Sequence, residues 1–240
     1  MIEWLRNAGG TPQIDIAGRR LPIELHRHPT AKRLILRIAP DGSAVRITLP
    51  RWCRSAEAIA FAGARKEWLA QQLAKVPERR DPAAERQITY RGSPIAVHWR
   101  EGAPRTARLE AGGLHLGGPE ETLGKRLQRW LEREAELLFA QDAAFFCDRA
   151  ALPTAPIRLT RARRRWGSCS TEGVLRLNWR LVQAPDAVRR SVVAHEVAHL
   201  VHFDHSPAFH ALLATLYDGN LGTADAWLSQ NGRTLYASFG

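Results

Sequence analysis

The segment VVAHEVAHLVHFDHSPAFHALL, residues 192–213, holds five of the nine histidines in the chain. His195 and His199 enclose Glu196 in the pattern HExxH. On an α-helix, residues four apart lie one turn apart on nearly the same face, so both imidazoles can point at one ion. Neutral imidazole is a common zinc ligand. Glu196 is displaced around the helix from both histidines, which favours a general base acting on a zinc-bound water.

A catalytic zinc uses three protein ligands and keeps one position open, and three more histidines follow the motif. On a continued helix, His202 would lie about 10.5 Å along the axis from His195. His195, His199 and His202 therefore cannot all bind one ion from a straight helix. Ser206 and Pro207 form a helix-start pair, which predicts a chain break between about His202 and Ser206. The turn can return His205 towards the metal, and His205 is the predicted third ligand.

The competing interpretation is a buried helix whose histidines and glutamate serve no metal. HExxH alone is a short pattern that also occurs by chance. Here Val193, Val197 and Leu200 supply an apolar surface that buries the helix, and a third histidine follows the chain break. These features favour the metal site. Asp204 can orient a ligand imidazole, but an aspartate that forms the turn is the more ordinary interpretation.

The bulk composition is that of an ordinary globular protein, with 45% hydrophobic and 25% charged residues among 240. The formal net charge of +11 makes nucleotides, nucleic acids or other anions plausible partners, although the same charge can simply favour solubility. Arg161 to Arg165 is the densest basic cluster. It is compatible with a solvated strand face, an anion-binding patch or stabilisation of an oxyanion beside the metal.

Three cysteines, Cys53, Cys147 and Cys169, are odd in number and widely separated, which favours a reducing cytoplasm over a disulfide framework. The N-terminal residues MIEWLRNAGG lack the apolar core of a signal peptide. No segment approaches the run of about 18 apolar residues that a membrane-spanning helix needs. We therefore expect a cytoplasmic protein with no membrane partner.

The chain is predicted to be an α+β protein with a β-rich N-terminal region over residues 13–118 and a catalytic region over 119–240 that carries the HExxH helix. Alternating apolar runs predict a meander over residues 14–49 and a second strand cluster over 87–118. One amphipathic helix is expected between them, over 55–76, with Ser55 as a candidate N-cap. No internal repeat is apparent. In the second region, the predicted helices cover 119–151 and 221–230 and begin at about 185 and 206.

Four motifs occur in order along the second half of the chain: Trp-Gly-Ser-Cys at 166–169, Asn-Trp-Arg-Leu at 178–181, HExxH, and the His-Ser pair at 205–206. As a set they resemble the YgjP-like metallopeptidases, zincin-fold proteins related to the SprT-like and Wss1-like proteases. The resemblance implies that the catalytic region over 119–240 is zincin-like. The resemblance implies that His195, His199 and His205 bind zinc and that Glu196 is the catalytic base. The histidine spacing also matches metzincins, but His202 replaces their glycine and Met1 is the only methionine, so no Met-turn can form.

The predicted function is a zinc-dependent hydrolase, with a metallopeptidase acting on a peptide or protein substrate in first place. By analogy with zincins, a strand near 166–169 can pair with an extended peptide. One alternative is a metal-dependent nucleotide pyrophosphohydrolase in which Arg161 to Arg165 neutralise phosphates. A second alternative, motivated by the net charge, is a nucleic-acid-associated protease or binding module. The sequence does not predict an oligomeric state.

Overall fold

The computed structural model describes residues 11–239 and divides the chain into two compact units, one up to Glu78 and one from Arg79. This boundary differs from the division that the sequence analysis drew between residues 118 and 119. The second strand cluster belongs to the later unit because its buried side chains, such as Ile88 and Leu114, share a core with the helix that follows. The residues in which an export signal was sought, 1–10, lie outside the described part.

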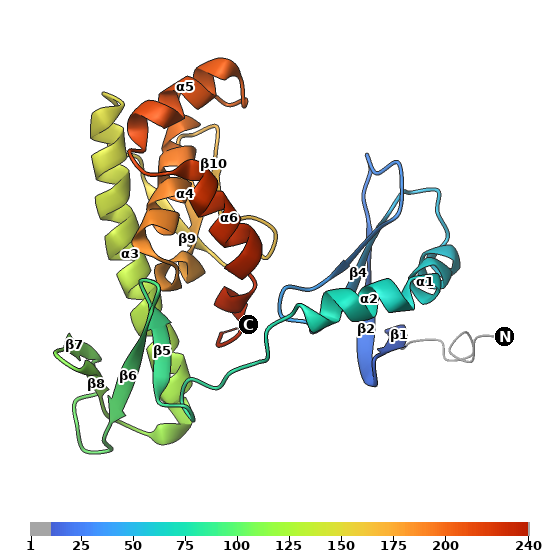
Figure 1. The fold of residues 1–240 in the computed structure, drawn as a ribbon, viewed down its shortest axis with the longest axis horizontal. Coiled ribbons are helices and arrows are strands. Elements are labelled where there is room, and N and C mark those ends of the chain that lie inside the picture. Colours follow the sequence, from blue (N-terminus) through green and yellow to red (C-terminus); the bar gives the residue numbers. More distant parts are fainter. Residues whose placement is uncertain (1–10, 240) are drawn as a thin grey trace. The chain divides into compact units, whose positions relative to one another are not determined.

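The first unit is a four-stranded sheet followed by two helices (Figure 1). Its sheet has the order β1-β2-β4-β3, and Ile16, Ile23, Ile47 and Leu69 form part of its core. The single helix predicted over 55–76 is broken at Arg65, whose backbone leaves helical geometry (φ −114°, ψ 23°), and Arg54 rather than Ser55 is the N-cap. The elements are β1 (Gln13–Ile16), β2 (Arg19–Arg27), β3 (Ile35–Ile38), β4 (Val45–Leu49), α1 (Ser55–Ala64) and α2 (Lys66–Ala74).

The second unit contains two sheets and four α-helices within the described residues. The sheet β5-β6-β8-β7 packs at the end where α3 begins, and α5 lies at the opposite end (Figure 1). The strands are β5 (Gln87–Tyr90), β6 (Ser93–Trp99), β7 (Arg108–Glu110), β8 (Gly113–Leu116), β9 (Ile157–Thr160), β10 (Gly167–Cys169) and β11 (Leu175–Asn178). The helices are α3 (Leu123–Arg149), α4 (Asp186–Ala198), α5 (Pro207–Leu216) and α6 (Leu221–Asn231), with short 3₁₀ turns η2 (Glu120–Thr122), η3 (Trp179–Gln183) and η4 (Thr234–Tyr236).

The two four-stranded sheets repeat one topology, which the sequence analysis missed. In the first sheet, β1 and β2 form an antiparallel hairpin, β4 pairs parallel with β2, and β3 pairs antiparallel with β4. In the second sheet, β5 and β6 form the hairpin, β8 pairs parallel with β6, and β7 pairs antiparallel with β8. The hairpins begin alike, as QIDIAG (13–18) and QITYRG (87–92), and both turn through two residues of positive φ. PIELH (22–26) and PIAVH (94–98) then correspond, but at a different offset from the turn, which conceals the repeat.

The remaining sheet and α4 form the framework of the candidate site. The sheet has the order β10-β11-β9, so β10 is an edge strand with one neighbour in the described structure. Helix α4 packs against β10 and lies between α3 and α6 (Figure 1). It begins at Asp186 after Pro185, as predicted. Hydrophobic contacts from Val193, Ala194 and Val197 bury this helix in the core.

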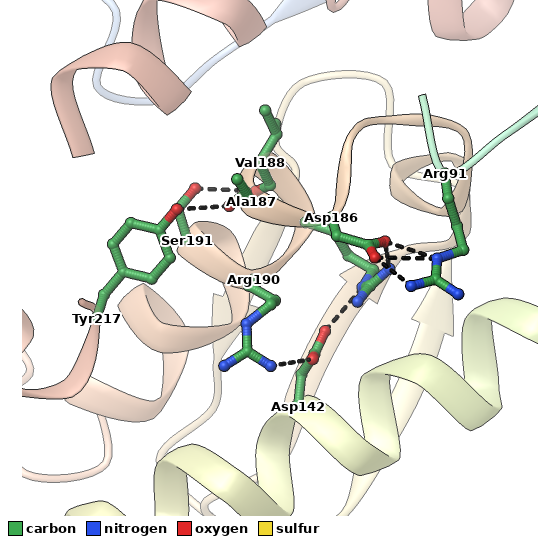
Figure 2. A network of polar contacts seen from close by, with 9 residues as sticks. Arg91, Asp142, Asp186, Ala187, Val188, Arg190, Ser191 and Tyr217 are labelled. Carbon is green, nitrogen blue, oxygen red and sulfur yellow. Dashed lines mark hydrogen bonds and ion pairs between the residues drawn. The ribbon is translucent and has the colours of Figure 1, made fainter. Parts of the chain in front are cut away.

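A network of charged side chains anchors the N-terminal half of α4 (Figure 2). Arg189 Nε donates to Asp142 Oδ2 of α3 at 2.7 Å, and both side chains are buried. Arg190 donates to the other oxygen of Asp142 at 3.1 Å. Arg91, in the β5–β6 turn, donates from Nε to Asp186 Oδ2 at 2.9 Å, and Asp186 also pairs with Arg189. Helix α3 and the β5–β6 turn are thereby both joined to one end of α4.

Two further observations concern membrane-spanning helices and the cysteines. In the described residues, no helix combines the length and the apolar character needed to cross a membrane. Cys53, Cys147 and Cys169 are all free thiols, as expected from their number and spacing.

Candidate metal centre

The structure brings together the three histidines that the sequence predicted as ligands. His195 Nε2 lies 3.2 Å from His199 Nε2 and 3.3 Å from His205 Nε2. One ligand atom from each ring lies within 4.8 Å of the other two. His195 is in the last turn of α4, His199 is its C-cap, and His205 comes from the following loop. Three imidazole nitrogens with no carboxylate or thiolate among them form a donor set suited to zinc.

Helix α4 ends earlier than predicted, and its end fixes the orientation of His199. The last helical residue is Ala198, whereas the sequence placed the break between about His202 and Ser206. The chain then turns so that His199 Nδ1 lies 2.9 Å from the backbone carbonyl oxygen of His202. Because a carbonyl only accepts, Nδ1 carries the hydrogen and donates, which leaves the Nε2 lone pair free for a metal. His202 thus helps to orient the His199 imidazole through its backbone carbonyl.

The start of α5 holds His205 in place. Ser206 is the N-cap of this helix, as predicted, and its Oγ accepts from the Phe209 amide at 3.4 Å. Asp204 Oδ1 accepts from the Ser206 amide at 3.3 Å, and the hydrogen bonds from Ser206 lower the pKa of Asp204. Asp204 therefore has the turn-forming position that the sequence analysis favoured.

Phe209 is a site residue that the sequence analysis did not identify. It is fully buried, and its ring centroid lies 5.0 Å from that of His195, 4.6 Å from His199 and 4.8 Å from His205. An apolar residue three positions after a helix N-cap was the available signal. Contact with all three imidazoles restricts their rotation, so little side-chain entropy is lost when they bind an ion.

Glu196 is buried beside β10 and only partly satisfied by hydrogen bonds. Its residue exposure is 5%, and its Oε2 has no hydrogen-bond partner within residues 11–239. Burial raises the pKa of Glu196 to about 7, against the lowering effects of the Cys169 backbone amide and the charge of Arg165. A buried carboxylate with an open oxygen is expensive for a fold, and such groups are concentrated at functional sites.

The absence of a side chain at Gly167 makes room for Glu196. A Cβ at this position would lie 2.6 Å from Glu196 Cγ and 2.7 Å from Cδ, closer than real Cβ contacts. Gly167 begins β10, within the Trp-Gly-Ser-Cys motif of the sequence. The same strand therefore admits the carboxylate at Gly167 and donates to it from Cys169.

Two arginines of the 161–165 cluster interact with different acidic groups. Arg161 pairs with Glu132 of α3 at 2.7 Å, while Arg165 is close enough to Glu196 to influence its pKa. Burial, followed by the neighbouring histidines, lowers the pKa of His195 to about 4. Its ring is therefore neutral near pH 7, the form that binds metal. The donor set, the neutral ring and the open carboxylate oxygen together fit a divalent metal.

Comparison with known protein families assigns this chain to a family of metallopeptidases. A sequence model described as "YgjP-like, metallopeptidase domain" matches residues 32–231, and its description supports a metal-dependent peptidase. Because this match spans most of the sequence, the chain belongs to the YgjP-like metallopeptidase domain family. The match begins in the first unit and extends through α6.

Other comparisons add little to this assignment. The crystal structure of the metallopeptidase zymogen of Pyrococcus abyssi abylysin is similar over 41% of this chain and 96% of its own, with 16% identity and a TM-score of 0.35. That similarity is too distant to support an inference about geometry. No curated protein sequence matches the chain.

Proposed function

We propose that the chain is a zinc-dependent metallopeptidase in which His195, His199 and His205 hold the metal and Glu196 is the catalytic base. The observation that carries this proposal is the convergence of one nitrogen from each of the three imidazoles within 4.8 Å. Glu196 adjoins the first ligand in the sequence, and its buried Oε2 has no hydrogen-bond partner in the described part of the chain. Membership of a metallopeptidase family supports the same reaction class.

The protein's own groups supply the proton transfers. When bound, zinc acts as a Lewis acid that polarises the scissile carbonyl and acidifies a water molecule. Glu196 accepts a proton from the attacking water at Oε2 and delivers it to the leaving amine nitrogen. The Cys169 amide holds the carboxylate in position, and Gly167 leaves it the necessary space. The His202 carbonyl keeps His199 in the tautomer that presents Nε2.

The edge strand β10 provides a surface for the substrate backbone. Because β10 pairs only with β11 in the described structure, its other edge can form main-chain hydrogen bonds with an extended peptide. Val201 and Phe203 lie in the loop between His199 and His205, and their exposed fractions are 46% and 59%. These apolar side chains next to the proposed ligands favour an unfolded peptide segment as the substrate.

Metal analysis combined with a hydrolysis assay tests this proposal. The purified chain should contain one zinc ion and cleave a fluorescently labelled unfolded protein, lose activity to a chelator and regain it with zinc. His195→Ala, His199→Ala and His205→Ala should each lose both zinc and activity. His210→Ala is the matched control, because its ring is 6.4 Å from that of His205 and outside the ligand cluster.

Two outcomes would contradict the proposal. One is full zinc content in any of the three ligand variants, which would remove that residue from the site. The other is cleavage of nucleoside triphosphates with no cleavage of protein, which would favour the predicted pyrophosphohydrolase instead. Nucleic-acid association remains a separate prediction, tested by salt-dependent retention on DNA.

A further inference from the structure

A large basic cavity lies in the second unit, between α3, β9 and the loops that flank β7 and β8. Its volume is about 980 Å³. None of the proposed zinc ligands lines it, and Glu196 does not line it either. Its wall carries six cationic side chains and two carboxylates. The six cations are Arg105, Lys125, Arg126, Arg129, Arg133 and Arg161.

Four of these cations form a stripe on one face of α3. Lys125 and Arg126 lie four and three residues before Arg129, and Arg133 lies four residues after it, so the four side chains project from one side of the helix. Leu127, Trp130 and Leu131 face the core instead. Like charges four residues apart destabilise a helix, which makes such a stripe unfavourable unless an anion neutralises it.

The carboxylates of the cavity compensate this charge incompletely. Glu132 is already engaged, because it accepts from Arg161 at 2.7 Å and from Gln128 at 2.9 Å. Arg126 Nη2 donates to the Pro119 carbonyl, but its buried Nε and Nη1 have no partner within residues 11–239. Burial and the nearby charge of Arg105 lower the pKa of Arg126. A bound anion would relieve this repulsion.

A buried tryptophan also borders the cavity. Trp179 lines the cavity with an exposed fraction of 1%, and its indole Nε1 finds no acceptor among the described residues. Buried indole N–H groups normally have an acceptor. Trp179 therefore leaves one buried donor beside the cavity without an acceptor among residues 11–239.

We propose that this cavity binds a small molecule bearing several contiguous phosphoryl groups. Guanidinium groups match phosphate oxygens in geometry and charge, and five of the six cations are arginines. A single carboxylate cannot neutralise the surplus of cations, whereas a polyphosphate carries several charges over a short length. The volume is that of a small-molecule site rather than a surface for duplex nucleic acid. The occupant is thus either a nucleoside polyphosphate or an inorganic polyphosphate.

Calorimetric titration of the full chain at fixed ionic strength tests the proposal, with inorganic tripolyphosphate and a nucleoside triphosphate as separate probes. At least one should bind saturably and more tightly than orthophosphate. Replacement of Arg129 and Arg133 by Gln should weaken binding at least about tenfold, because each loses charge-assisted hydrogen bonds. Both side chains are exposed, so the fold should persist. Equal affinity for both probes identifies the phosphate chain as the recognised group, and preference for the nucleotide adds a base contact.

Two control variants distinguish this site from general electrostatics and from the zinc site. Arg158→Gln removes an exposed charge from β9 outside the cavity and should leave affinity within about twofold. His195→Ala disables the proposed zinc site and should bind polyphosphate as the parent does. The proposal is overturned if neither probe binds saturably, if Arg158→Gln loses as much affinity as the double variant, or if His195→Ala abolishes binding. Tighter binding of a single-stranded oligonucleotide than of either probe also overturns it.

Discussion

The buried charged side chains at the two ends of α4 differ in whether their charge is paired. Near the N-terminal end, Arg189 is buried but pairs with both Asp142 and Asp186 (Figure 2). At the C-terminal end, Glu196 is buried to a similar degree, yet its Oε2 has no partner within the described residues. One helix therefore carries a satisfied ionic network at one end and an unsatisfied carboxylate at the other.

The paired charges near Arg189 anchor the helix, whereas the Glu196 carboxylate at the other end is available for a reaction. A buried charge that keeps its partners resists rearrangement, and removal of one partner leaves the other uncompensated. A buried charge without a full set of partners costs stability and keeps an atom available for proton transfer. Mutations at the two ends should consequently affect different measurements.

The largest effect is expected from Glu196→Gln. Hydrolysis of an unfolded protein should fall about a thousandfold, because the amide cannot accept the proton from water. The zinc content should remain that of the parent, since Glu196 is not among the three clustered histidines. The thermal midpoint should not decrease, because a neutral group replaces a buried carboxylate.

Glu172→Gln is the matched control for this variant. Glu172 lies in the exposed turn between β10 and β11, so the same chemical change should leave activity intact. A Glu196→Gln enzyme with parental turnover would show that another group is the base. A large loss of zinc would instead move Glu196 into the metal-holding role.

The second effect is at the opposite end of the helix, where Asp142→Asn should reduce the free energy of unfolding by about 3 kcal/mol. The reason is that Arg189 and Arg190 lose the negative charge that they share. Urea denaturation followed by circular dichroism measures this change. Zinc content and turnover per folded molecule should be unchanged, the reverse of the Glu196→Gln result.

Glu120→Gln is the control for charge removal. Glu120 pairs with Arg86 at the surface, with 57% of its side chain exposed, and such pairs contribute about 0–1 kcal/mol. If Asp142→Asn is no more destabilising than Glu120→Gln, the network at the N-terminal end is not an anchor. The proposed contrast between the two ends would then be lost.

The third effect concerns Gly167→Ala. The added methyl group should displace the Glu196 carboxylate, and a displacement of about 1 Å reduces turnover about a hundredfold. We expect kcat to fall more than KM changes, with zinc retained. Gly124→Ala is the matched control, because none of the described residues places an atom within 4 Å of a Cβ at that position of α3. Parental turnover in Gly167→Ala would remove the positioning role.

The sequence predicted those parts of the site that are determined locally. The HExxH spacing and the Ser206-Pro207 helix start depend on a few adjacent residues, and the three predicted histidines do converge. The end of α4 at Ala198 was not predicted, because Leu200 and Val201 carry no breaking signal. The role of Gly167 depends on how β10 packs against α4, which no local pattern records.

For the fold, local sequence signals predicted the individual helices and strands better than they predicted which of these elements pack together. The long α3 follows from helix periodicity, the start of α4 from the Pro185-Asp186 pair, and the start of α5 from the Ser206 cap. The division at 118 was drawn where strand patterns give way to a long helical pattern. The second sheet nevertheless packs onto α3 through residues distant in sequence, such as Tyr90 and Trp130, whose ring centroids are 5.0 Å apart. The repeated sheet topology was obscured because the Pro-Ile pair follows the turn at different distances.

The smallest effect is expected at Ser206, which links the end of α4 to the third histidine. Ser206→Ala removes the acceptor for the Phe209 amide and should cost about 1 kcal/mol of stability at the start of α5. Because Asp204 and Phe209 hold His205 through this same turn, zinc affinity should fall about fivefold, as measured by competition with a chelator. Ser206→Thr retains a capping hydroxyl and should restore most of both. Loss of stability without loss of zinc affinity would show that the cap serves the helix and not the ligand.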